Sequence, residues 1–358
     1  MFARWIHSWR DLPLKLNQWA NVVRWEMRPR AFLRTTEFFW QEGHTAHATY
    51  EEAHQEVLTM LGEYVDLAQN WLAIPVVSGL KPEMEKFPGA DKTYTFEGLM
   101  QDGKAVQMGT SHLLSQSFAK SFDMMFQDEA GERRYPYLTS WGATTRLIGT
   151  VIMVHGDQKG LVLPPKIAPI QVVIIPITKT NADNELTLRT ADQLQQRLEQ
   201  QGVRVHVDND SHKTPGAKFY HWELKGVPLR IELGPRDIAA QSMVISDRLG
   251  LGKDTVPLAH LEQVVREKLD LLQKELFDRA SARREAHWFK VSKLTDFGKQ
   301  LADNGGFYQA GWCGAAECEQ QLRQYQATIR CILGVNENPI CFACDKKSNG
   351  DVLIAKSY

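Results

Sequence analysis

The segment VVRWEMRPRAFLRTTEFFWQEGHTAH, residues 22–47, decides how the first part of this chain folds. It contains two runs rich in β-branched and aromatic residues, 22–26 and 35–45, which we predict to be the strands of a hairpin. Successive side chains on a strand point to opposite faces of the sheet, so every second residue shares a face. One face of the hairpin then collects Val22, Arg24, Glu26, Arg34, Thr36, Phe38, Trp40, Glu42 and His44.

That face combines arginines, carboxylates, aromatic rings and a histidine. Burying such charges is costly unless a charged ligand pairs with them, which favours a binding site. The alternative is a surface sheet whose polar side chains are simply hydrated. A metal site formed by His44 and His47 is disfavoured, because residues three apart on a strand point to opposite faces.

Length and composition limit the class of protein. A chain of 358 residues is expected to form two or three domains, and 43% hydrophobic with 24% charged residues is typical of soluble globular proteins. The net charge of −1 means that a polyanionic partner must bind to local basic patches. We find no apolar run of membrane-spanning length and no signal peptide, and five cysteines without a secretion signal indicate a reducing compartment. The prediction is a cytoplasmic protein.

The first half of the chain is predicted to mix strands and helices. A helix over residues 49–72 begins with the capping-box pair Thr49 and Glu52. Strands are predicted over 93–100 and 104–108, and Thr110 is a candidate cap for a helix with apolar residues every fourth position. Another helix is expected after Thr144, and a Gly- and Pro-rich stretch leads to a domain boundary near Pro169.

The second half begins with a different pattern. Predicted strands over 171–177, 203–207 and 227–233 are combined with a helix over 190–201, which indicates a small α/β domain with a mostly parallel sheet. A long amphipathic helix over 258–283 follows, and then a segment with four of the five cysteines. We therefore predict domains over residues 1–168, 169–283 and 284–358.

The cysteines form two close pairs. Cys313 and Cys318 are separated by four residues, Cys341 and Cys344 by two, and such spacing is typical of a four-cysteine zinc site. The alternative is four reduced, partly buried thiols. Cys331 lies in the apolar run ATIRCIL and is predicted to be a core residue.

The hairpin also resembles a known motif. Class II aminoacyl-tRNA synthetases share a second motif in which R-x-D/E precedes a loop and then R-x-x-x-F-x-x-x-D/E. Arg24 and Glu26 match its first part, and Arg34, Phe38 and Glu42 match its second. Further blocks resemble prolyl-tRNA synthetases of the archaeal and eukaryotic kind: RDLPLKLNQW (10–19), FLRTTEFFWQEGHTAH (32–47), GTSHLLSQSFAK (109–120), SWGATTRLIG (140–149), HGDQKGLVLPP (155–165) and WELKGVPLRIELGPRD (222–237).

This resemblance implies an α+β protein with a class II catalytic core, an α/β anticodon-binding domain and a small C-terminal zinc-type α/β domain. It implies ATP-dependent attachment of L-proline to tRNA(Pro) through a prolyl-adenylate. Arg24 and Arg146 would be catalytic, with Arg24 contacting both the α-phosphate and the carboxylate of proline. The implied ATP-binding residues are Arg24, Glu26, Arg34, Thr35, Gln107, Thr110, Thr144 and Arg146, and Gln107 would also help to hold Mg²⁺.

For proline, the resemblance implies a pocket of aromatic walls and a carboxylate, which suits a small apolar ring with a secondary ammonium. Its residues would be Arg24, Trp40, Glu42, His44, Phe87 and His112. Two of the implied contacts have simpler alternatives. Phe87 could have a role in loop packing alone, and Thr110 could serve as a helix cap without contacting a ligand.

For tRNA, the resemblance implies that the second domain recognises the anticodon. Residues 211–236 contain five basic and two acidic side chains, a modest positive excess for a phosphate backbone. Phe219, Glu232 and Arg236 are candidates for stacking on the bases and bonding to their edges, although an ordinary charged face would have a similar composition. Cys313, Cys318, Cys341 and Cys344 correspond to a structural zinc site that some members carry.

The beginning of the sequence lacks two features expected from the resemblance. Motif 1, which builds the homodimer interface of the full-length enzymes, and a proline-binding T-x-E loop do not precede RDLP, so the expectation is an N-terminally truncated chain. No large insertion separates the hairpin from Arg146, so no editing domain is expected there. The alternative function is a catalytically impaired fragment that binds tRNA.

Overall fold

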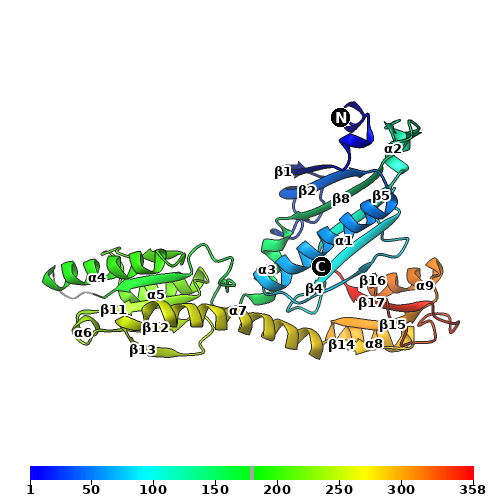
Figure 1. Cartoon of the computed structure of the whole chain (residues 1–358). Coiled ribbons are helices and arrows are strands. Elements are labelled where there is room, and N and C mark those ends of the chain that lie inside the picture. Colours follow the sequence, from blue (N-terminus) through cyan, green and yellow to red (C-terminus); the bar gives the residue numbers. More distant parts are fainter. Residues whose placement is uncertain (178–180) are drawn as a thin grey trace. The chain divides into compact units, whose positions relative to one another are not determined.

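A ten-stranded sheet organises the first of two compact units (Figure 1). The computed structural model describes residues 1–177 and 181–358, with the backbone alone for residues 181–184. Unit 1 contains Met1–Gln69, Pro75–Met153 and Ser281–Tyr358, and unit 2 contains Asn70–Ile74 and Val154–Ala280. The domain boundaries expected after residues 168 and 283 remain predictions.

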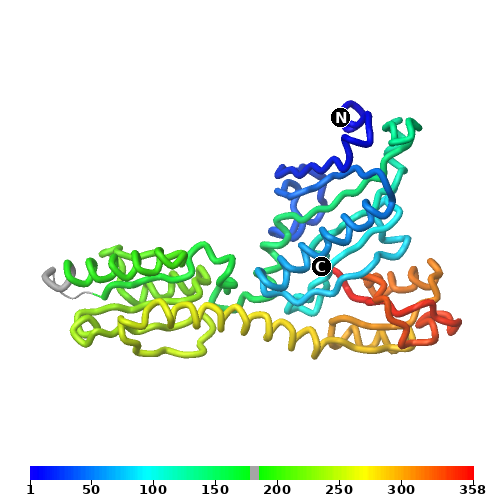
Figure 2. Tube along the Cα trace, in the orientation of Figure 1, coloured from blue at the N-terminus to red at the C-terminus, as the bar shows by residue number. Residues whose placement is uncertain are grey.

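The sheet of unit 1 has the strand order β1-β2-β8-β5-β4-β3-β16-β17-β15-β14. All neighbouring strands are antiparallel except β14 and β15. The C-terminal segment, orange to red in Figure 2, joins this sheet where β16 pairs with β3. The strands are β1 Leu14–Val23, β2 Glu37–His47, β3 Val76–Leu80, β4 Lys92–Leu99, β5 Ala105–Ser115, β8 Tyr137–Thr144, β14 Trp288–Lys290, β15 Phe307–Trp312, β16 Ala327–Ile332 and β17 Gly350–Lys356.

The predicted hairpin is present, but its first strand lies earlier than expected. β1 ends at Val23, so the prediction of a strand over 22–26 is wrong for Arg24 and Glu26, which lie in the connection to β2. The Arg24 amide still donates to the Thr36 carbonyl, and beyond it the Glu26 carboxylate accepts the Arg28 amide in a turn. Pro29 cannot donate to a ladder, which is consistent with the strands separating here.

β2 fits tightly between its neighbours. A Cβ atom at Gly43 would collide with the Trp141 indole on β8, so this close approach requires glycine. From Phe38 to His44, alternate side chains of β2 line one face, as predicted.

Helix α1 (Tyr50–Asp66) covers the other face of the central strands. Thr49 and Glu52 form the predicted capping box: the Thr49 hydroxyl accepts the Glu52 amide, and the Glu52 carboxylate accepts the Thr49 amide. The helix buries Ala53, Val57, Leu61 and Tyr64. A short π-helical segment, Leu67–Trp71, extends it, which confirms a helical region over the predicted residues.

The helix predicted to begin at Thr110 is wrong. Thr110 lies inside β5, which pairs with both β4 and β8 at the centre of the sheet. Pairing on both sides outweighs the four-residue apolar spacing that suggested a helix. The apolar residues Leu114 and Phe118 do pack in one cluster, but α2 is confined to Ser117–Ser121.

Unit 1 also contains the ribbon β6 (Phe126–Gln127) and β7 (Arg133–Arg134), the helices α3 (Arg146–His155), α8 (Leu294–Asn304) and α9 (Ala316–Gln320), and short 3-10 turns at Phe2–Arg4, Trp9–Asp11 and Gln321–Tyr325. α3 follows β8 directly, as predicted for a helix after Thr144.

Unit 2 is a five-stranded sheet with strand order β10-β9-β11-β12-β13. β10, β9 and β11 are parallel, whereas β12 and β13 pair in antiparallel fashion. The prediction of a mostly parallel sheet is therefore wrong for β12 and β13. The sequence pattern did not identify the two antiparallel strands. The strands are β9 Val172–Pro176, β10 Val205–Val207, β11 Leu229–Leu233, β12 Ser242–Asp247 and β13 Lys253–Pro257.

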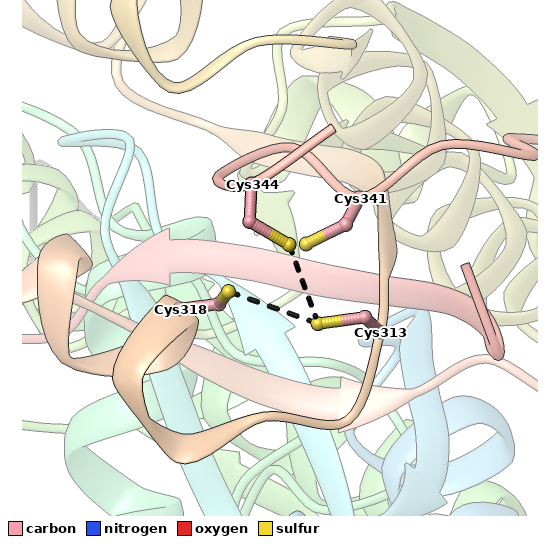
Figure 3. Close-up of side chains that lie close together, drawn as sticks. All are labelled: Cys313, Cys318, Cys341 and Cys344. Atoms are coloured by element: carbon pink, nitrogen blue, oxygen red, sulfur yellow. Dashed lines mark hydrogen bonds between the residues drawn. The ribbon is translucent and has the colours of Figure 1, made fainter. Parts of the chain in front are cut away.

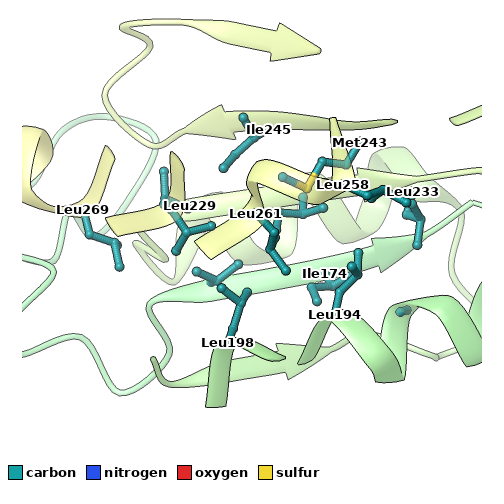
Figure 4. Close-up of a cluster of buried hydrophobic side chains, with 14 of the residues drawn as sticks. Ile174, Leu194, Leu198, Leu229, Leu233, Met243, Ile245, Leu258, Leu261 and Leu269 are labelled. Carbon is teal, nitrogen blue, oxygen red and sulfur yellow. The ribbon is translucent and has the colours of Figure 1, made fainter. Parts of the chain in front are cut away.

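Helices pack against this sheet around a buried aliphatic core (Figure 4). Ile174 and Ile231 of the sheet meet Leu194 and Leu198 of α4 and Leu261 of α7. The helices are α4 Asn181–Glu199, α5 Pro215–Leu224, α6 Pro235–Ala239 and α7 Leu261–Ala286, and α7 continues into unit 1. Within the described residues, no helix combines the length and apolar character that a membrane span requires.

Candidate active site

Unit 1 contains a cavity of about 1280 Å³ over the face of the hairpin, β8 and β5. All of the residues predicted to bind ATP or proline line it. They are Arg24, Glu26, Arg34, Thr35, Trp40, Glu42, His44, Phe87, Gln107, Thr110, His112, Thr144 and Arg146. The anticodon candidates lie in unit 2.

Strand register explains why distant residues meet in this cavity. Gln18, Glu42, Gly142 and Thr110 occupy successive paired positions across β1, β2, β8 and β5. The neighbouring row contains Leu16, His44, Ser140 and His112 in the same way. Because paired strands lie about 4.8 Å apart, each row crosses the cavity floor as a continuous line of paired residues.

The Glu42 carboxylate is held from two sides. Gln18 Nε2 donates to Glu42 Oε2 at 2.9 Å, and His44 Nε2 lies 3.2 Å from the same oxygen. Partial burial raises the pKa of Glu42, but His44, Gln18 and Arg24 together outweigh this effect and lower the pKa below its usual value. The site therefore presents an ionised carboxylate. Gln18 was missed, although extending the alternation back from Val22 would have placed it on this face.

Arg24 lies over aromatic rings. Its guanidinium carbon is 5.6 Å from the centre of the Phe38 ring and 5.3 Å from that of Trp40. Such stacking orients the planar guanidinium while its N–H groups can bind an anion in the cavity. Arg24 is therefore ordered by the hairpin even though it lies outside the strand.

Arg146 begins α3 and is fixed by backbone carbonyls. Its Nε donates to the Leu33 carbonyl at 3.0 Å, and its Nη1 donates to the Gln107 carbonyl at 3.1 Å. The Tyr358 ring lies 5.3 Å from Arg146 and 5.6 Å from Arg34, and its hydroxyl donates to the Leu33 carbonyl. Sequence reasoning missed these contacts of Tyr358, because no local pattern connects residues more than 200 positions apart.

His112 is held at both ring nitrogens. Nδ1 lies 3.0 Å from the Thr93 hydroxyl and Nε2 lies 2.9 Å from the Thr110 hydroxyl, and the Phe87 ring packs 4.9 Å away. Burial lowers the pKa of His112 to about 4, although the charge of Glu42 acts in the opposite direction. The imidazole is therefore neutral at pH 7, and Thr110 holds it in addition to lining the cavity.

The low pKa of His112 predicts a pH dependence of stability. The unfolded chain binds a proton at His112 near pH 6.5, whereas the folded chain does so only near pH 4. Between these values the unfolded state binds more protons, so this contribution to stability is complete above about pH 6.5 and decreases as the pH falls. The decrease in melting temperature from pH 7 to pH 5 should be smaller for His112→Asn than for the wild type. If the melting temperatures of the two proteins decrease equally from pH 7 to pH 5, this expectation is wrong.

In unit 2, two of the three anticodon candidates are connected by Arg230. Its guanidinium lies 4.1 Å from the centre of the Phe219 ring and donates to Glu232 at 3.0 Å. Lys253 also donates to Glu232, so two cations already engage this carboxylate. Arg236 lies on α6, which begins directly after β11.

Four cysteines of the C-terminal segment converge, as predicted (Figure 3). The sulfur of Cys313 lies 3.7 Å from those of Cys318 and Cys344, and the four sulfurs including that of Cys341 are within 4.8 Å of one another. A tetrahedral zinc ion with Zn–S bonds near 2.3 Å separates its sulfurs by about 3.8 Å, so the donor set fits zinc. Cys331 is fully buried on β16, which confirms it as a core residue.

The fold and this cavity define a class of protein, the class II aminoacyl-tRNA synthetases. Residues 1–155 match the family model for the tRNA synthetase class II core domain (G, H, P, S and T), and residues 171–268 match the anticodon binding domain. Residues 294–358 match the model for the C-terminal part of prolyl-tRNA synthetase. The chain belongs to the prolyl-tRNA synthetase family.

Individual relatives agree with this assignment. The chain is 48% identical over its full length to the proline--tRNA ligases of Acetoanaerobium sticklandii and Flavobacterium psychrophilum, and it covers 74% and 73% of those proteins. A solved prolyl-tRNA synthetase from Cryptosporidium parvum, complexed with L-proline and AMP, superposes with a TM-score of 0.95 at 44% identity. That match covers 100% of this chain and 78% of the other. The predicted family and fold class are confirmed.

Proposed function

We propose that this chain catalyses the ATP-dependent attachment of L-proline to tRNA(Pro) through a prolyl-adenylate. One observation carries the proposal: all residues predicted for ATP and proline line one cavity, in a chain closely similar to proline--tRNA ligases over its full length.

In the first step, a carboxylate oxygen of proline attacks the α-phosphorus of ATP, a new P–O bond forms, and pyrophosphate leaves. Such a reaction depends on alignment and on neutralisation of charge more than on a protein nucleophile. Arg24 would bind both the carboxylate and the α-phosphate, because its planar guanidinium suits two anions. Arg146 would bind the nucleotide beside Thr144 and Gln107, which it contacts.

Other residues of the cavity would complete the nucleotide site. We assign Glu26, Arg34, Thr35 and Thr110 to ATP, as the family motif implies. Mg²⁺ bound with ATP would neutralise phosphate charge, and the amide oxygen of Gln107 is a suitable hard ligand that lines the cavity. In the second step, a hydroxyl of the terminal tRNA ribose attacks the carbonyl carbon of the adenylate, and AMP leaves.

The proline end of the cavity has the features that a cyclic amino acid needs. Trp40, Phe87 and neutral His112 would enclose the apolar ring, and the ionised Glu42 would attract the secondary ammonium, with His44 holding that carboxylate. The packing of Phe87 against His112 supports its assignment to the pocket over a role in loop packing alone.

We assign the remaining parts to tRNA binding and stability. Unit 2 would bind the anticodon, with Phe219, Glu232 and Arg236 as candidates, and the four cysteines would hold a structural zinc ion. We also propose that the enzyme works as a homodimer in the cytoplasm, as the family resemblance implies.

Proline-dependent ATP–pyrophosphate exchange tests the function. The purified chain should incorporate labelled pyrophosphate into ATP only when proline is present, and alanine and glycine serve as controls. Exchange that is absent or independent of proline, in a chain that still binds tRNA(Pro), would contradict the proposal and favour a tRNA-binding role.

A further inference from the structure

Beneath the cavity, the C-terminal segment contributes a buried charge to the catalytic part of the sheet. Glu97 on β4 is fully buried, and its two charged neighbours, Lys81 after β3 and Arg330 on β16, are also buried. β3 and β16 are adjacent strands that pair at Leu80 and Ile332, so the three charges meet where the two segments join. We call Lys81, Glu97 and Arg330 the charge triad.

The Glu97 carboxylate is fully engaged by this arrangement. Arg330 donates to Oε2 from Nε at 3.0 Å and from Nη2 at 2.8 Å. Lys81 Nζ donates to Oε1 at 3.2 Å, and the Thr95 hydroxyl donates to the same oxygen at 2.7 Å. Burial raises the pKa of Glu97, but the neighbouring charges outweigh it and lower the pKa, so the carboxylate is ionised.

Lys81 connects the charge triad to the proline end of the cavity. It begins the loop of residues 81–88, and its amide donates to the Thr93 carbonyl at 2.8 Å. Later in this loop, the Phe87 amide donates to the Thr93 hydroxyl, which also contacts His112. Lys81 and Phe87 both line the cavity. Thr93 therefore holds the loop at both ends, and the charge triad additionally fixes the Lys81 side chain at its beginning.

The charge triad is not expected to stabilise the fold more than apolar residues would. Removing three charges from water is costly, and well-packed apolar residues are often at least as stabilising. The charges instead determine side-chain positions. Arg330 fixes the orientation of the Glu97 carboxylate, and this carboxylate fixes the position of the Lys81 ammonium.

We propose that Arg330 is a positioning residue for proline binding, which acts through Glu97 and Lys81 on the loop that carries Phe87. This inference deepens the proposed function and rests on it. ATP binding should depend less on Arg330, because hydrogen bonds to the Leu33 and Gln107 carbonyls hold Arg146, whereas Glu97 and Arg330 act on it through their charges.

The test compares proline and ATP affinities of Arg330→Met with those of the wild type, by calorimetric titration and by KM values in the exchange assay. We expect the proline Kd and KM to rise about tenfold, as for residues that act through a packed network, with changes below about threefold for ATP. Lys290→Met is the matched control: its ion pair with Glu337 is exposed and lies in the same C-terminal segment. It should behave as the wild type.

Two further variants separate positioning from stability. Arg330→Lys keeps the charge and loses the planar fork, so its proline affinity should lie between those of wild type and Arg330→Met. The apolar triple variant Lys81→Met, Glu97→Leu, Arg330→Met leaves no charge unpaired, and should fold stably and yet bind proline weakly. Wild-type proline affinity in Arg330→Met or in the triple variant would overturn the inference. A wild-type chain that does not bind proline would instead overturn the proposed function.

Discussion

Replacing Arg24 by alanine should slow proline-dependent exchange by about 10²–10³-fold, the loss expected when one donor to a developing oxyanion is removed. The structure places this guanidinium over Phe38 and Trp40 on the floor of the cavity. Because Arg24 is assigned to both the proline carboxylate and the α-phosphate, kcat/KM should decrease for both substrates. Replacing a residue that binds only the nucleotide would mainly lower kcat/KM for ATP.

Two comparisons make the Arg24 experiment specific. Arg24→Lys keeps the positive charge, but cannot bind two anions with one planar fork, so most of the activity should still be lost. Arg10→Ala is the matched control, since Arg10 also lies over a tryptophan, Trp9, but outside the cavity. Its exchange rate should be unchanged. If Arg24→Ala keeps its exchange rate within threefold of the wild type, the catalytic assignment of Arg24 is wrong.

The hairpin shows what alternation along a strand can and cannot predict. Trp40, Glu42 and His44 share the cavity face because β2 is a regular strand, and its register is sufficient to group them. Arg24 reaches the same cavity from an irregular connection, so the strand argument grouped it correctly for the wrong reason. The family motif predicts Arg24 as a site residue without depending on the local backbone.

Several of the failures have a common physical origin, which is dependence on distant partners. Thr110 lies in a strand because β4 and β8 pair on both sides of it, and no local pattern contains that information. The same is true of Tyr358 beside Arg146 and of Arg330 beside Glu97. For Tyr358 and Arg330, the deciding contacts are those between the C-terminal segment and residues of the first half of the chain. They become apparent only when β16 is placed beside β3.

Loss of the proposed zinc ion should have the second large effect, on stability. Structural zinc sites contribute about 10–16 kcal/mol of apparent binding free energy in small peptides, and this energy stabilises the folded state. Cys318 and Cys341 belong to the hydrophobic core of the C-terminal segment, so this core packs directly around the proposed ion. Cys341→Ser should therefore lower the zinc content from one ion per chain to nearly none and the melting temperature by roughly 10 °C or more.

The fifth cysteine provides the control for this experiment. Cys331 is as deeply buried as Cys341 but lies outside the cluster, so Cys331→Ala should lose a little core packing and keep its zinc. Zinc content measured by elemental analysis after purification under reducing conditions, together with melting curves with and without a chelator, distinguishes the two variants. A metal-free wild-type chain whose melting temperature a chelator does not change would contradict the zinc site. The four converging sulfurs would then be reduced thiols, and the stability of the segment would depend on its apolar core alone.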